Sequence, residues 1–81
     1  MTTDHTGAAA ARDAAQREHV IADRQAELAE MERRASDAAP TQWQRTAHRL
    51  ASEVHADAAA SHERGARLRE LEAEVDERGL V

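Results

Sequence analysis

A single proline near the middle of the chain limits the possible folds more than any other residue. Pro40 is the only proline, and residues 8–39 before it contain no glycine. The proline ring disfavours the helical conformation for the preceding residue, so a helix should end just before it. Thr41 and Gln44 then have the spacing of a capping box, which marks the start of a helix. The sequence therefore predicts two helices joined by a bend.

The two predicted helices are long and should pack against each other. Apolar residues recur at spacings of three and four, as in a coiled coil, and this predicts helices over 8–37 and 42–78 around a bend at 38–41. Gly79 can cap the second helix, and residues 1–7 are expected to form a flexible leader. The predicted fold is all-α, a long antiparallel helical hairpin in which residue numbers summing to about 80 lie opposite each other.

The large apolar residues are the natural candidates for the contact surface. We expect them to face the other helix or a partner molecule, with the one tryptophan anchored at the bend. Small residues around Gly65 would let the two backbones approach closely; the alternative is a glycine without a structural role. The predicted interface residues are Ile21, Leu28, Met31, Trp43, Leu50, Val54, Leu68, Leu71 and Val75.

Two arginines interrupt the apolar stripe of the first helix. Arg17 and Arg24 can lie at its rim, with their stems packed and their charges in water. Alternatively, Arg24 can pair across the hairpin with Asp57, since the two numbers fit the antiparallel register. Such a pair would fix the register at some cost in stability.

Histidines recur every seven residues along the second helix, at His48, His55 and His62. Side chains this far apart on one helix cannot bind the same metal ion, because the helix rises about 10 Å between them. The simplest interpretation is an exposed flank. A metal site completed by a partner helix and a pH-sensitive edge are the alternatives. His19 and Asp23, one turn apart, are a weak signal for a metal site.

Composition argues against several classes of function. The net charge is −5, whereas nucleic-acid-binding proteins carry a clustered basic surface. Cysteine is absent, so no disulfide or thiolate site can form. No apolar run approaches membrane length and no signal-peptide pattern is present, which predicts a cytoplasmic protein. Catalytic and phosphate-binding motifs are absent too, so we expect no enzyme activity, cofactor or small-molecule substrate.

The remaining expectation is a protein–protein interaction module. The chain has 81 residues, only 1% of them aromatic, and a single core of this size is marginally stable. A second copy would cover apolar residues that one hairpin leaves exposed. We therefore expect a homodimer, arranged as a four-helix bundle, that presents helix faces to a further protein partner.

Two families offer alternative interpretations. Bacterial factors that enter the RNA polymerase channel use a coiled-coil hairpin with acids at its tip, and the expected hairpin resembles them in architecture, with Asp37 at its tip. It carries one acid where those factors place a cluster. The hairpin also resembles the small secreted proteins named for a Trp-x-Gly turn, because Trp43 lies between the two helices. Here Gln44 and Arg45 replace the x-Gly.

Overall fold

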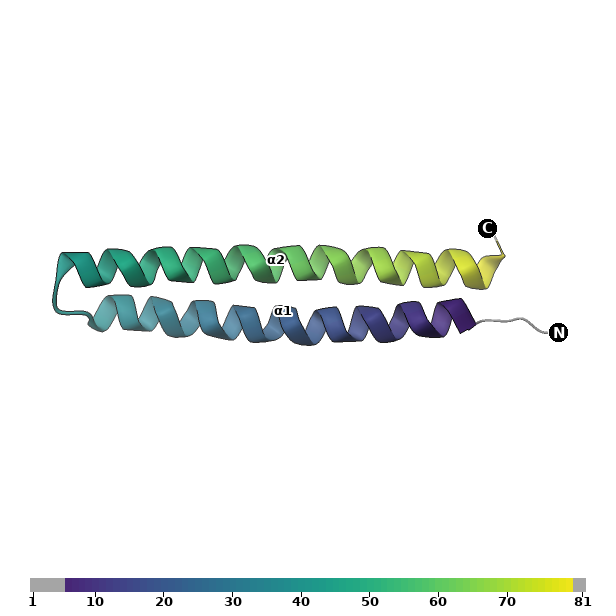
Figure 1. Ribbon diagram of the computed structural model, residues 1–81, viewed down its shortest axis with the longest axis horizontal. Helices are drawn as coiled ribbons and strands as arrows, with labels where there is room; N and C mark the ends of the chain where they lie inside the picture. Colours follow the sequence, from purple (N-terminus) through teal and green to yellow (C-terminus); the bar gives the residue numbers. More distant parts are fainter. Residues whose placement is uncertain (1–5, 80–81) are drawn as a thin grey trace.

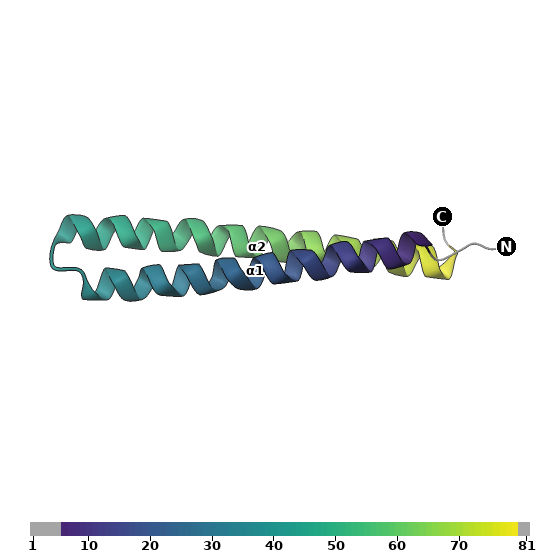
Figure 2. The same cartoon turned by 60° about the horizontal axis from the view of Figure 1, so that its bottom comes forward.

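The chain folds into two antiparallel helices that pack along their whole length. The computed structural model describes residues 6–79, with helix α1 over Thr6–Ala38 and helix α2 over Gln42–Arg78. The open end, where α1 begins and α2 ends, lies opposite the bend in a rod of 65 × 15 × 10 Å (Figure 1). In a second view the helices cross at a shallow angle (Figure 2). The predicted all-α hairpin is confirmed; residues 1–5 of the expected leader lie outside the described residues.

The bend is built by hydrogen bonds on both sides of Pro40. The Thr41 hydroxyl accepts a hydrogen bond from the backbone N–H of Gln44 at 3.1 Å, as a helix cap should. The same hydroxyl donates a hydrogen bond to the side-chain oxygen of Gln44 at 3.0 Å. The Ser36 hydroxyl donates to the carbonyl of Arg45 at 2.8 Å, and this bond ties the two helix ends together.

The end of α2 is capped by Gly79 as predicted. Its backbone has φ of 70° and ψ of 31°, a left-handed conformation that glycine adopts without steric cost. Its N–H donates to the carbonyl of Asp76 at 3.1 Å. Helix α2 therefore ends at the glycine that the sequence places there, through a left-handed cap.

The surface that joins the two helices consists of alanine. On α1 the buried positions recur every seven residues, and on α2 they are separated by multiples of seven. The buried residues among those described are Ala8, Ala15, Ala22, Ala29, Ser52, Ala66 and Ala73. We call this set the alanine seam. Side chains this small let two helices approach each other closely.

The predicted seam of large apolar residues inside the hairpin is wrong. Ile21 and Leu28 each lie one residue before a seam alanine, which turns them about 100° away from the centre of the contact. Ile21 is 40% exposed, Leu50 54%, Val54 66% and Leu68 63%. The helices meet instead through the smallest side chains, which bring the backbones close enough for hydrogen bonds to cross between them. The larger side chains remain on the outside.

One of these crossing bonds lies inside the seam. Ser52 is 7% exposed, and its hydroxyl donates to the carbonyl oxygen of Ala29 at 2.8 Å. A buried hydroxyl without a partner would be costly, and this bond satisfies it. It also fixes the register of the two helices, because it joins one defined position on α2 to one on α1.

Candidate functional site

A ladder of hydrogen bonds from histidines crosses between the helices beside the alanine seam. His62 Nδ1 lies 2.9 Å from a carboxylate oxygen of Glu18, and His48 Nδ1 lies 3.0 Å from one of Glu32. Between these pairs, His55 Nδ1 lies 2.6 Å from the side-chain oxygen of Gln25. Each pair has residue numbers that sum to 80, so the antiparallel register that the sequence predicts is confirmed.

These histidines lie on a flank of the helix contact, as the sequence indicates, but they are not simply exposed there. His48, His55 and His62 are all half-buried, and each faces an acceptor on α1. The sequence does contain a signal for these hydrogen bonds, but it is a repeat of polar residues and not a pattern of large apolar ones. The acceptors repeat every seven residues on α1, in step with the histidines on α2, and the seam alanines repeat with the same period.

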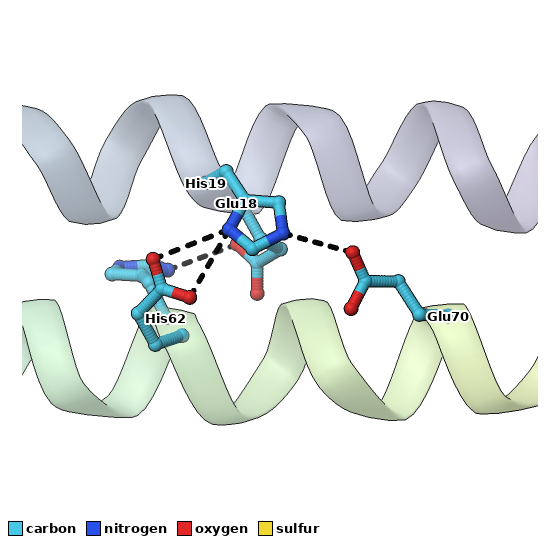
Figure 3. Close-up of polar contacts among 5 residues, drawn as sticks. Glu18, His19, His62 and Glu70 are labelled. Carbon is cyan, nitrogen blue, oxygen red and sulfur yellow. Dashed lines mark hydrogen bonds and ion pairs between the residues drawn. The ribbon is translucent and has the colours of Figure 1, made fainter.

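A second row of charged contacts runs along one side of the hairpin, toward its open end. His19 on α1 lies between two glutamates of α2: its Nδ1 is 3.1 Å from Glu63, and its Nε2 is 3.0 Å from Glu70. Figure 3 shows this ring between carboxylates, with the His62–Glu18 pair beside it. One heptad closer to the open end, Arg12 forms an ion pair with Glu77.

The two contacts of His19 can be satisfied together only when its ring is protonated. A neutral imidazole has one N–H, whereas both nitrogens of His19 face carboxylate oxygens, which only accept hydrogen bonds. The imidazolium donates at both nitrogens and satisfies both carboxylates. The hydrogen bond to Glu70 and then that to Glu63 raise the pKa of His19 above its usual 6.5.

Gly65 lies on the side of the hairpin that carries the His62–Glu18 pair. A Cβ atom at this position would be 2.5 Å from the Glu18 carboxylate, the same carboxylate that accepts from His62. Glycine thus leaves room for one of the crossing hydrogen bonds. This supports the close-approach interpretation of Gly65, although the group that comes close is a side chain rather than the α1 backbone.

The same side of the hairpin carries several of the large apolar residues that are exposed or half-buried. Gly7, one residue before the seam Ala8, lines a surface hollow together with Leu68, Leu71 and Val75 of α2. Ile21 and Leu28 have the same place in the heptad as Gly7, since each also precedes a seam alanine. They therefore lie on this side of α1. This apolar surface continues over further exposed residues, both on the outer side of the helices and along α2 toward the bend. We call the whole surface the apolar face: Ile21, Leu28, Met31, Trp43, Leu50, Val54, Leu68, Leu71 and Val75.

Two predicted contacts do not form. Arg24 forms an ion pair with Glu27 of its own helix at 3.5 Å, and both Arg24 and Asp57 are exposed. The alternative in which they form a register pair is therefore wrong, because both side chains lie away from the alanine seam. Trp43 does not pack at the bend: it is 77% exposed, the largest exposure among the large apolar side chains of the described residues.

The remaining candidate chemistry is sparse. Within residues 6–79, no three histidine or acidic side chains are grouped so that they could hold a metal ion. Asp37, the proposed tip acid, is exposed in the last turn of α1 and shares a hollow with Arg33 and Arg49. Neither described helix has an apolar stretch long enough to cross a membrane.

Comparison with known proteins adds no relative. The chain matches no protein-family model, curated protein or solved structure.

Proposed function

We propose that this chain is a non-enzymatic interaction module, a helical hairpin that self-associates through its apolar face. One observation carries the proposal: the hairpin buries alanine and leaves its large apolar side chains in water. Met31 is 57% exposed, Leu50 54%, Leu68 63% and Leu71 56%, although larger side chains bury more apolar area than alanine does. Contiguous exposed apolar surface on a small domain marks a protein-binding site.

A second copy of the chain is the occupant that best suits this face. The face extends over both helices, from Gly7 and Val75 at the open end to Trp43 near the bend. Two such faces in contact would form a four-helix bundle with two-fold symmetry, in which the same residues of both copies share the interface. The polar side, with His19 and its glutamates, would remain in water.

Charge also favours this face over the others as a site of self-association. The opposite side carries the carboxylates of Glu63, Glu70 and Glu77, and a chain with a net charge of −5 repels its own copies there. On α2, the hollow of the apolar face is lined by Leu68, Leu71 and Val75, with Glu72 and Asp76 as its charged members. Association through it places the acidic sides on the outside of the bundle.

The test is a charge placed on the apolar face. Leu68→Glu should abolish association, because a buried unpaired carboxylate is strongly disfavoured at an interface. Helicity should persist, because Leu68 is mostly exposed within one hairpin. Analytical ultracentrifugation over a wide range of concentrations measures the first effect, and circular dichroism of the same samples measures the second.

Ala60→Glu is the matched control. Ala60 lies on α2, is exposed, and stands outside the apolar face, so the variant adds the same charge without touching the proposed interface. We expect it to associate like the wild type. A wild-type chain that stays monomeric at every concentration would refute self-association, and the apolar face would then belong to a different protein partner.

A further inference from the structure

His19 links the two helices through both of its ring nitrogens, which none of the other described histidines does. The ring lies 3.1 Å from Glu63 and 3.0 Å from Glu70, and these glutamates are seven residues apart on α2. Seven residues correspond to about 10 Å of helix, so one side chain of α1 spans two turns of α2. A contact of this kind resists both separation of the helices and sliding between them.

The link depends on a single proton. With both nitrogens protonated, the ring donates one hydrogen bond to each carboxylate and compensates part of their negative charge. Once the ring loses a proton to solvent, one nitrogen becomes an acceptor. That nitrogen then faces a carboxylate oxygen that is also an acceptor, so one of the two contacts is lost and the positive charge of the ring no longer offsets the two carboxylates.

Among the described residues, His19 is the cation paired with Glu63 and Glu70; Arg67 lies between them on α2 but is exposed and forms no ion pair with either. Helix α2 is the only described element packed against it, and Glu63 and Glu70 are the charged groups that α2 presents to the ring. On α1, Asp23 lies one turn away, and Arg12, two turns away, is paired with Glu77. Loss of the proton therefore leaves this part of the polar side more negative.

We propose that His19 is a proton-operated clasp, which fastens α1 to Glu63 and Glu70 when its ring is protonated and loosens this part of the hairpin when the ring is neutral. The proposal goes beyond self-association, because the clasp lies on the polar side and acts within one chain. It makes the stability of the hairpin depend on pH in the range where cells and their compartments differ.

The direction of the effect follows from linkage. The folded hairpin binds the His19 proton more tightly than the unfolded chain does, since the pKa is raised above 6.5. The stabilisation is therefore complete below the unfolded pKa of 6.5 and is lost as the pH rises through the higher folded value. The hairpin should be held more firmly at mildly acidic than at mildly alkaline pH.

A histidine titration by NMR tests the clasp directly in the wild-type chain. The His19 ring should titrate at a higher pH in the folded protein than in the same protein unfolded in urea. Replacing both partners, in the double variant Glu63→Gln and Glu70→Gln, should move the pKa of His19 back toward the unfolded value. Glu53→Gln removes a single charge from an exposed position on α2 and should move it much less than either Glu63→Gln or Glu70→Gln alone. A folded pKa equal to or below the unfolded one would overturn the proposal.

Urea unfolding at about pH 6 and about pH 8.5 tests the consequence for stability. His19→Gln should lower the urea midpoint at the acidic pH and change it less at the alkaline pH. The other histidines are present in both proteins, so their contribution cancels in the difference. An equal difference between wild type and variant at both pH values would show that His19 is only a structural contact.

Discussion

The alanine seam predicts how two substitutions, only two residues apart, change the stability of the hairpin. The order of their effects should be the reverse of that in an ordinary coiled coil. Ala66 is completely buried, whereas Leu68 is 63% exposed. Enlarging Ala66 to leucine should push the helices apart. Truncating Leu68 to alanine should leave one hairpin nearly unchanged. In a coiled coil with leucine in its seam, the truncation would be the damaging change.

The magnitudes follow from burial. Overpacking a well-packed contact costs about 1–3 kcal/mol, and Ala66→Leu should lie at the upper end because the seam has no larger neighbour that could yield. Fully burying a leucine is worth about 1.5–3 kcal/mol. Since Leu68 buries only about a third of its surface, Leu68→Ala should cost the isolated hairpin about 0.5–1 kcal/mol. The first loss is a substantial part of the roughly 5–15 kcal/mol that stabilises a small domain.

Urea denaturation followed by circular dichroism measures both values. The experiment should use a concentration at which the chain is monomeric, because Leu68 also belongs to the proposed dimer interface. At higher concentration the cost of Leu68→Ala should grow, while that of Ala66→Leu should not. If Ala66→Leu is neutral and Leu68→Ala is the more damaging variant in the monomer, the helices meet through the leucines and the alanine seam is refuted.

Two further predictions concern single residues near the seam. Gly65→Ala gains about 1 kcal/mol of helix propensity but displaces the Glu18 carboxylate, so we expect a smaller gain than in the background of Glu18→Ala, where nothing obstructs the new methyl group. Equal gains in the two backgrounds, measured by thermal unfolding, would contradict the crowding. Trp43 should emit like indole in water when the chain is dilute and shift to the blue as it associates, because one hairpin leaves it exposed and a second copy would cover it. Blue-shifted emission that does not change on dilution would place the indole inside the hairpin.

Much of the fold follows from the sequence because its signals are local. Pro40, the Thr41 cap and Gly79 each act on the backbone within a few residues, and the bend and the end of α2 lie where they predict. The antiparallel register also follows, since a short bend leaves little choice of pairing. These features depend on steric and hydrogen-bonding rules that hold for any chain.

The face that each helix presents could not be deduced by looking for large apolar residues. Ile21 and the seam residue Ala22 are neighbours in the sequence, and choosing between them decides which side of α1 is inside. Hydrophobicity favours isoleucine, but the repeat of alanine and the matching repeat of hydrogen-bonding pairs such as Glu18 and His62 favour alanine. The clasp at His19 depends on this rotation, so it could not be found before the faces were known.

The alanine seam also bears on how this protein responds to temperature. The heat capacity of unfolding grows with the apolar surface that is newly exposed, and a hairpin held by methyl groups and crossing hydrogen bonds exposes little of it. The free energy of the single hairpin should therefore change with temperature along a shallow curve. Association would bury the large apolar side chains and so raise the heat capacity of unfolding. The free energy of the dimer should therefore change with temperature more strongly than that of the single hairpin.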